Sequence, residues 1–271
     1  MALLFMAIGS LIMVVFSPWA PLLGRVADYL GRIGLAALLL TLILLAHRTS
    51  RFEKYRPLLL ALFIMSVAVS LDWIFGIYLI EYLGVTDETP AGWAFLKLNE
   101  CIVIVGVIIL FTKMSRDTLG SIYIQKGNLK QGLIIGLSTF FLAVAGSIPM
   151  ASLFGAQDLS LARILPWTPW LLIYVLANAT MEELLFRGLF LRKLQPFFGK
   201  ILSNLMIALV FTALHGAVNY SVDQYLFLAI LFPLALIWGY IMQKTDSVWG
   251  SILFHAGMDI PIMLGIFSNL A

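Results

Sequence analysis

The chain has 271 residues, of which 62% are hydrophobic and 11% are charged, and its formal net charge is +3. Soluble domains carry roughly 25% charged residues, so this composition excludes an ordinary soluble domain and predicts a polytopic membrane protein. The Lys and Arg residues fall in short loops between apolar runs, so the positive charge indicates membrane topology and not nucleic acid binding. We expect an all-α bundle of eight or nine transmembrane helices that forms a single domain over residues 1–271.

The first 160 residues contain apolar runs that can cross the roughly 30 Å hydrocarbon core of a bilayer. A charged loop with Arg25, Asp28 and Arg32 is predicted after the first run. The second run is short unless residues 27–31 join it, and losing or merging one of the first two runs lowers the count from nine to eight. Residues 115–131 are polar with interspersed apolar residues and are predicted to lie along the membrane interface. The five predicted spans in this part are residues 2–23, 33–46, 58–80, 96–111 and 132–154.

The remaining sequence predicts four more spans and an orientation. When alternate loops are assigned to the two sides, most of the 17 Lys and Arg residues fall on one side. The positive-inside rule makes that side cytoplasmic and places the C-terminus on the other side. These four spans are predicted at residues 167–197, 201–219, 225–242 and 248 to the end.

The segment of residues 178–193, NATMEELLFRGLFLRK, places two carboxylates and an arginine inside an apolar run. An ionised carboxylate at the centre of a membrane helix costs roughly 2.5 to 3.5 kcal/mol, so such residues usually have a function. Glu183 and Arg187 are one helical turn apart and can neutralise each other. Glu182 points about 100° away from that pair and can face a neighbouring helix. The alternative is that all three form a structural ion-pair cluster.

Two of the three histidines, His215 and His255, lie inside predicted spans. A lone histidine on an apolar face is more often a hydrogen-bonded core residue than a catalyst. Ionisable groups in a membrane seek one another, however, so two histidines in helices near Glu182 predict a shared site. Each shares its helical face with neighbours one turn away: Phe211, Thr212 and Asn219 for His215, and Ser251 and Asp259 for His255.

These residues resemble the three motifs of a known family. The EE-LLF-R pattern of Glu182, Glu183 and Arg187 comes first, and the F-TAL-H pattern that ends at His215 and the H-AGM-D pattern that begins at His255 follow on separate spans. The pattern resembles the CAAX protease and bacteriocin-processing (CPBP) family, which includes the type II CAAX prenyl endopeptidase. The resemblance implies that residues 167–268 are the catalytic helices and that residues 1–160 are variable N-terminal helices.

The resemblance implies an intramembrane endopeptidase that hydrolyses a peptide bond with an activated water. In the family, the residue that matches Glu182 is the general base and is assisted by the one that matches His215. The residues that match His255 and Asp259 stabilise the oxyanion. The family typically has asparagine where this chain has Asp259, and a carboxylate cannot donate a hydrogen bond unless it is protonated. Asp259 therefore either orients His255 or completes a zinc site.

The zinc site would be formed by Glu182, His215, His255 and Asp259, which are ligand types that zinc accepts. The sequence contains no HExxH motif, and we expect metal-independent chemistry with zinc as the alternative. The expected partners are the lipid bilayer and a peptide or membrane-protein tail as substrate, and no nucleic acid. The short loops favour a multi-pass protein of a bacterial plasma membrane.

Two other classes of function remain open. A membrane transporter with a buried carboxylate and histidine relay would use similar residues, but the sequence shows no paired halves. A catalytically inactive immunity or scaffold protein could keep the same helices and bind a partner peptide. Two further acidic residues near membrane depth, Asp72 and Glu100, are expected to be structural.

Overall fold

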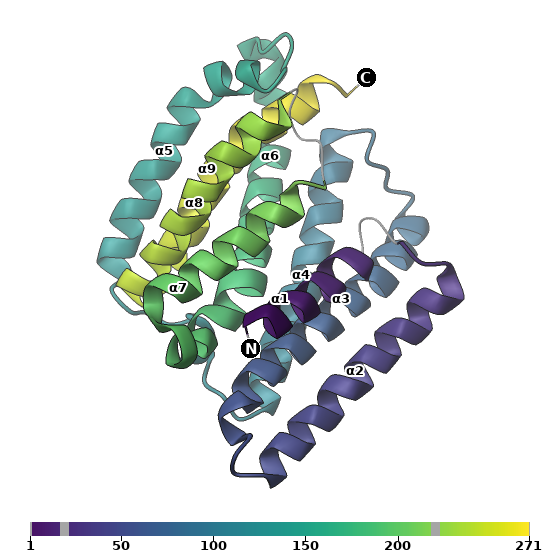
Figure 1. The fold of residues 1–271 in the computed structure, drawn as a ribbon. Helices are drawn as coiled ribbons and strands as arrows, with labels where there is room; N and C mark the ends of the chain where they lie inside the picture. The colour runs from purple at the N-terminus through teal and green to yellow at the C-terminus, as the bar shows by residue number, and fades with distance from the viewer. Residues whose placement is uncertain (1, 17–21, 218–222, 271) are drawn as a thin grey trace.

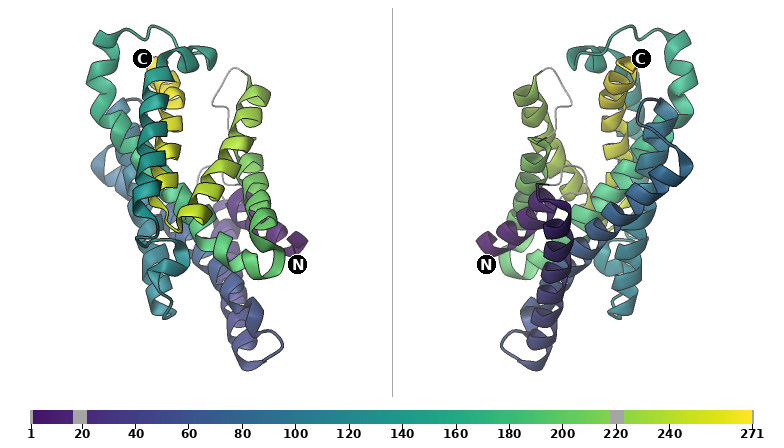
Figure 2. Two further views of the ribbon diagram at one scale, coloured as in Figure 1. Left: turned by 90° about the vertical axis from the view of Figure 1, so that its left-hand side faces the viewer. Right: turned by 90° about the vertical axis from the view of Figure 1, so that its right-hand side faces the viewer.

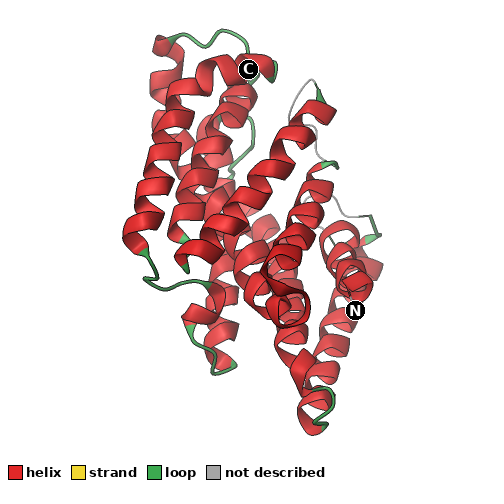
Figure 3. Cartoon of the chain, turned by 60° about the vertical axis from the view of Figure 1, so that its left-hand side comes forward, coloured by secondary structure: helices red, strands yellow, loops and turns green. Residues whose placement is uncertain are grey.

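The computed structural model describes residues 2–16, 22–217 and 223–270, and these residues form a helical bundle (Figure 1). Figure 3 shows helices joined by loops, with no strand in the described ranges. The prediction of an all-α polytopic membrane protein is therefore confirmed. The predicted end of the first span and the predicted end of the seventh span, including Asn219, lie partly outside the described residues.

The N-terminal part begins with a helix that is too short to cross a bilayer. The α-helix α1 (Ala2–Ser10) continues into the π-helix η1 (Leu11–Val15), and together they stay below the roughly 20 residues that a span requires. Three membrane-length helices follow: α2 (Arg25–Arg48), α3 (Arg56–Leu83) and α4 (Pro90–Met114). The first predicted span is thus not a membrane-length helix in the described residues.

The predicted loop at Asp28 and Arg32 is wrong, because both residues lie inside α2 and are buried. The Arg32 Nε atom donates to Asp28 Oδ2 over 2.7 Å, one helical turn away. The Arg32 guanidinium also lies 5.8 Å from the ring centre of Phe16 and 5.5 Å from that of Trp73. Pairing the two charges and covering them with aromatic rings allows this charged turn to extend the short second run into a full span.

The C-terminal part contains a membrane-length stretch of 55 residues, 161–215, that bends within itself. The bend lies at Gly199, whose φ of 71° and ψ of 175° are not helical. The stretch therefore forms two arms, as the sequence predicted, and it is one of 7 membrane-length segments in the described residues, with its second arm, residues 200–215, shorter than the first. The elements of this part are α5 (Leu129–Leu153), α6 (Leu161–Glu182), the π-helix η4 (Glu183–Gly188), α7 (Leu189–His215), α8 (Gln224–Thr245) and α9 (Trp249–Ser268).

The helices alternate in direction along the bundle. The connections at residues 49–55, 115–128 and 246–248, and the bend at Gly199, lie at the lower ends of the helices in Figure 1. The C-terminus and the α5–α6 connection lie at the upper end. The α2–α3 hairpin extends furthest at the lower end, as Figure 2 shows. The basic loops therefore share one side of the molecule, as the alternation of loops in the sequence predicted.

Small residues bring α5 and α9 close together. A Cβ atom added to Gly136 would lie 2.8 Å from Leu253 Cβ and 2.9 Å from the Gly250 carbonyl oxygen. A Cβ atom added to Gly250 would lie 2.7 Å from the carbonyl oxygen of Gly132. In lipid no hydrophobic driving force brings helices together, so their association depends on van der Waals packing. Glycines strengthen this packing because they let two backbones approach closely. This contact fixes the position of α9, which carries the second predicted histidine.

The segment that was predicted to lie along the interface instead packs under the turn between α8 and α9. It contains the 3₁₀-helix η3 (Leu119–Ile122), and the carbonyl oxygen of the buried Tyr123 accepts a hydrogen bond from the Val248 N–H over 3.1 Å. Gln125 Nε2 donates to Asp246 Oδ2 over 2.6 Å, and Asp246 also pairs with Arg192 of α7. Burial raises the pKa of the Tyr123 phenol above its ordinary value. We call these contacts the loop clasp.

The contact between α5 and α9 leads to a first prediction. Gly136→Val should lower the melting temperature of the detergent-solubilised protein, because the added methyl groups would overlap α9 at a cost of about 1 to 3 kcal/mol. The matched control is Gly146→Val on the same helix, where an added Cβ meets nothing within 4 Å. Equal melting temperatures of the two variants would contradict the proposed packing.

Candidate functional site

Five helices enclose a cavity of about 60 Å³, which has room for more than one water molecule. Its polar lining consists of Asn178 and Glu182 from α6, His215 from α7, and His255 and Asp259 from α9. Apolar and aromatic side chains from α5, α6, α8 and α9 complete the lining, including Tyr174 of α6. The two helices α8 and α9 diverge from their connecting turn in Figure 2, and the cavity lies between them and α6. The structure thus brings four of the six predicted site residues to one cavity.

Glu182 presents its carboxylate to this cavity. Its Oε2 atom lies 3.5 Å from His255 Nε2, and its side chain is 12% exposed. The same oxygen is buried and has no hydrogen-bond partner among the described residues. Buried polar atoms are almost always satisfied, so an unsatisfied one often indicates a functional site or a water. The orientation agrees with the helical geometry, which predicted that Glu182 faces a neighbouring helix.

Glu183 is completely buried, and hydrogen bonds hold both of its carboxylate oxygens. Its Oε1 atom accepts a hydrogen bond from Arg187 Nη1 over 2.7 Å and lies 2.9 Å from His255 Nδ1. Its Oε2 atom accepts a hydrogen bond from the Ser251 hydroxyl over 2.5 Å. The predicted ion pair within the helix is therefore present, and Glu183 is fixed behind the cavity and not at its surface.

Arg187 is also completely buried, and it lies outside the described lining of the cavity. Its Nη2 atom donates to the carbonyl oxygen of Ala235 over 3.2 Å. The guanidinium carbon lies 4.7 Å from the ring centre of Phe211 and 5.3 Å from that of Trp238. A guanidinium over aromatic faces gains cation–π stabilisation, which is strongest where water is excluded. Arg187 thus joins α7 and α8 while it balances the charge of Glu183.

His255 is held between an indole ring and three carboxylates. Its ring stacks on Trp238, with 3.9 Å between the ring centres and 11° between the planes. The Nδ1 atom contacts Glu183, and Nε2 lies 3.5 Å from both Glu182 Oε2 and Asp259 Oδ1. Because a carboxylate accepts, the Nδ1 atom carries a proton in its contact with Glu183. The opposite nitrogen is directed at the two carboxylates of the cavity.

His215 is the last residue of α7, and its ring is fixed by its own helix. Its Nδ1 atom lies 2.9 Å from the Phe211 carbonyl oxygen, which accepts a hydrogen bond, so a neutral His215 has its lone pair on Nε2. The Phe211 ring lies 4.4 Å from that of His215 and 5.9 Å from that of His255. Phe211 therefore packs against both imidazoles.

The end of α7 at His215 is capped by a residue of α8. Gln224 Nε2 donates to the His215 carbonyl oxygen over 2.8 Å. Two of the neighbours that the sequence predicted for His215 are less informative. The Thr212 hydroxyl is buried and has no hydrogen-bond partner among the described residues. Asn219 lies outside the described residues.

Asp259 is anchored by a residue that the sequence did not single out. Asn178 Nδ2 donates to Asp259 Oδ2 over 3.0 Å. Asn178 lies one helical turn before Glu182, so it occupies the same face of α6, and this spacing is the signal that could have identified it. Ser251 was noted for its spacing from His255, but its bond to Glu183 depends on the packing of α9 against η4.

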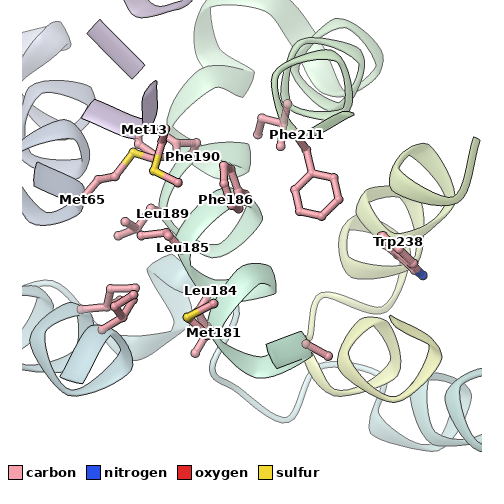
Figure 4. Close-up of a cluster of buried hydrophobic side chains, with 14 of the residues drawn as sticks. Met13, Met65, Met181, Leu184, Leu185, Phe186, Leu189, Phe190, Phe211 and Trp238 are labelled. Atoms are coloured by element: carbon pink, nitrogen blue, oxygen red, sulfur yellow. The ribbon is translucent and has the colours of Figure 1, made fainter. Parts of the chain in front are cut away.

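The π-helix η4 begins at Glu183, directly after Glu182, and all six of its residues are buried. Single π-helical turns inside α-helices are rare and are frequent at functional sites. In Figure 4, Leu185 of η4 and Phe190 of the following α7 lie on the side of Met13 and Met65, and Trp238 lies on the opposite side. The short N-terminal helix thus packs behind the site and supports the turn that carries the carboxylates.

The four candidate zinc ligands line one cavity without forming a preorganised metal site. No group of three or more His, Cys, Asp or Glu side chains has the geometry of a metal site in the ranges that the structure describes. Zinc is bound at about 2.0 to 2.2 Å by nitrogen and oxygen ligands. Asn178 binds Asp259 Oδ2 and Glu183 binds His255 Nδ1, which leaves His255 Nε2 and Asp259 Oδ1, 3.5 Å apart, outside those two bonds. A bond of this kind to the second nitrogen of a histidine is also found beside bound metals, so only the arrangement of the ligand groups disfavours a preorganised zinc site.

Two other acidic residues that the sequence analysis noted do not belong to the described lining of the cavity. Asp72 is buried within α3. Glu100 of α4 pairs with Lys97 over 2.5 Å.

Residues 164–261 match the family model described as "Type II CAAX prenyl endopeptidase Rce1-like". The matched range contains η4 and all six predicted site residues, from Glu182 to Asp259. The match confirms the resemblance that the three motifs indicated. No match was found among curated proteins or among solved structures.

The buried ion pair leads to a second prediction. Arg187→Met should destabilise the protein by about 3 to 5 kcal/mol, because it leaves Glu183 buried without a counter-charge. The melting temperature in detergent measures this loss, and Glu183→Gln/Arg187→Met should recover part of it. The control is Arg51→Met in an exposed loop. If Arg187→Met melted at the same temperature as this control, the ion pair would not stabilise the fold.

Proposed function

Because residues 164–261 are an Rce1-like domain of the type II CAAX prenyl endopeptidase family, we propose that this integral membrane protein is an endopeptidase whose Glu182 activates a water. The observation that carries this proposal is the contrast between two adjacent carboxylates. Hydrogen bonds satisfy both oxygens of Glu183, whereas Glu182 lines a cavity together with two imidazoles, and its Oε2 atom has no hydrogen-bond partner among the described residues.

The reaction can be derived from these positions. A water in the cavity gives a proton to Glu182, and His215 Nε2 accepts a second hydrogen bond from the same water and orients it. The water oxygen then bonds to the carbonyl carbon of the substrate, and the carbonyl oxygen becomes an oxyanion. When the C–N bond breaks, the proton held by Glu182 passes to the leaving amine. The products are a carboxylic acid and an amine, the acid proton passes to the amine to give a carboxylate and an ammonium, and Glu182 returns to its ionised form.

The oxyanion requires hydrogen-bond donors that are already in place. A His255 ring protonated on both nitrogens donates from Nδ1 to Glu183 and from Nε2 into the cavity. Stacking on Trp238 and the bond to Glu183 restrict the rotation of this ring. Glu183 and Arg187 therefore act in the proposed mechanism as positioning residues, because they hold His255 without facing the substrate.

The lining also suggests a class of substrate. Apart from its polar residues, the cavity is lined by apolar side chains, among them Phe154, Phe227 and Met258. Such a lining suits a hydrophobic peptide or the tail of a membrane protein that reaches the site within the bilayer. The description of the matched family names a CAAX prenyl endopeptidase, so prenylated CAAX proteins are one candidate group of substrates. The short loops favour a bacterial plasma membrane, where other peptides would be the substrates.

Glu182→Gln tests the proposed mechanism. We expect kcat to fall by about 10²- to 10⁴-fold, because the amide cannot accept the proton of the water. The assay uses the full chain in detergent with a library of internally quenched peptides and one prenylated peptide that ends in a CAAX sequence. Glu88→Gln, in an exposed loop, is the matched control and should cleave like the wild type.

The outcomes of this experiment separate the alternatives. Unchanged cleavage by Glu182→Gln would remove the general-base role of Glu182. If the folded wild-type protein cleaved no peptide in either set, the peptidase proposal would fail, and the inactive scaffold or the transporter would become the better explanation.

A chelator tests the choice between a glutamate-activated and a metal-activated water. We expect cleavage to persist after dialysis against 1,10-phenanthroline, because no group of three His, Cys, Asp or Glu side chains is arranged as a metal site within the described ranges. The peptidase assay before and after dialysis measures this. Loss of cleavage that added zinc restores would show that the metal-independent mechanism is wrong.

A further inference from the structure

We propose that Asn178 is a further catalytic residue, whose side-chain amide donates a hydrogen bond to the oxyanion. This inference rests on the proposed peptidase function and adds a donor from α6 to the one that His255 provides from α9. It also gives Asp259 a specific task, which is to hold the amide of Asn178 in the orientation that donates.

The positions of four residues on two helices carry the inference. Asn178 and Glu182 are one turn apart on α6, and His255 and Asp259 are one turn apart on α9, so each pair occupies one helical face. The two faces meet at two points. Glu182 Oε2 lies 3.5 Å from His255 Nε2, and Asn178 Nδ2 lies 3.0 Å from Asp259 Oδ2. All four side chains line the same cavity.

Hydrogen-bond chemistry decides which member of the second pair can stabilise an oxyanion. An ionised carboxylate only accepts, so Asp259 cannot donate to a negatively charged oxygen. A side-chain amide has two N–H groups on one nitrogen. One N–H of Asn178 is used by Asp259, and the second N–H of this cavity-lining residue is left for another acceptor. Asn178 can therefore act as a neutral donor at this end of the site.

The bond to Asp259 also fixes the orientation of the amide. If the amide of Asn178 were rotated by half a turn, its carbonyl oxygen would face Asp259 Oδ2, and two acceptors would meet at about 3.0 Å. That arrangement is unfavourable, so the carboxylate selects the orientation in which the nitrogen faces Asp259 and keeps a second N–H to donate. An oxyanion site depends on donors that do not need to reorient during the reaction.

A purely structural role for the same bond would consist of joining α6 to α9. The chain offers a matched control for that role, because Asn204 of α7 donates from Nδ2 to the Leu236 carbonyl oxygen of α8 over 2.8 Å. Asn204 does not belong to the described lining of the cavity. Loss of its bond should lower the melting temperature and leave kcat per folded molecule unchanged.

The test compares kcat, KM and melting temperature of the full chain in detergent, with a quenched peptide that the wild type cleaves. Asn178→Ala should lower kcat by about 10²- to 10³-fold with little change in KM, because the lost donor acts on the transition state. Asn178→Ser keeps a donor and should retain more activity than Asn178→Ala. Asn204→Ala should retain the kcat of the wild type.

A second set of variants tests the pairing. Asn178→Asp places two carboxylates in contact, so its activity should be lower than that of Asn178→Ala at neutral pH and should recover as the pH falls and the pair takes up a proton. Asn178→Asp/Asp259→Asn restores one amide and one carboxylate and should recover much of the lost kcat. A structural bond alone would give the same pH dependence in the melting temperature, so the catalytic role requires that kcat per folded molecule follow the pH while the folded fraction stays constant.

The activities of these variants distinguish a wrong role for Asn178 from a wrong proposed function. If Glu182→Gln lost activity while folded Asn178→Ala kept the kcat of the wild type, the role of Asn178 would be wrong and the proposed function would stand. If Asn178→Ala lost activity only in proportion to its loss of folded protein, as Asn204→Ala should, the residue would be structural. If the wild type cleaved no peptide, both proposals would fail.

Discussion

The arrangement of the site depends on one buried charge, the carboxylate of Glu183. Removing a carboxylate from water is costly unless a counter-charge and hydrogen bonds replace the water, and here Arg187, His255 and Ser251 do so. These three partners belong to two different helices, so satisfying one charge also fixes α9 against the helix that carries the carboxylates. The adjacent Glu182 can remain incompletely satisfied because its neighbour supplies this rigidity.

Aromatic side chains complete the same structure. Trp238 stacks on His255, and Arg187 lies over both Trp238 and Phe211. Large rings exclude water from the back of the site, which strengthens the ionic contacts that they cover. The polar atoms of the site are therefore divided between a closed rear side around Glu183 and a front side that faces the cavity.

The sequence predicted the parts of this structure that follow from local geometry. The spacing of Glu183 and Arg187 predicted their ion pair, and the hydrophobic runs predicted most of the membrane-length helices. Local geometry could not reveal the partner of Asn178, because the bond to Asp259 joins residues that are 81 positions apart. The π-helical turn after Glu182 was not predictable either, because it arises from packing and leaves no periodicity in six residues.

The error at the second span has a related cause. Charged residues at positions 28 and 32 indicated a loop, but their mutual pairing and the ring of Trp73 allow them to lie inside α2. A pair of opposite charges one turn apart is compatible with a membrane helix when its surroundings supply further contacts. Glu183 and Arg187 form a second pair of this kind, with opposite charges one turn apart and aromatic rings over the guanidinium.

The loop clasp ties together two helices that line the cavity. Arg192 continues the helix that carries the carboxylates, and Asp246 and Val248 directly precede the helix that carries His255. Their contacts with the 119–128 segment hold both helices at the lower end of the bundle. At the upper end, Ser268 accepts hydrogen bonds from the Gln157 N–H and from Arg163 Nη2, so α9 is anchored at both ends and the depth of its histidine in the bundle is fixed.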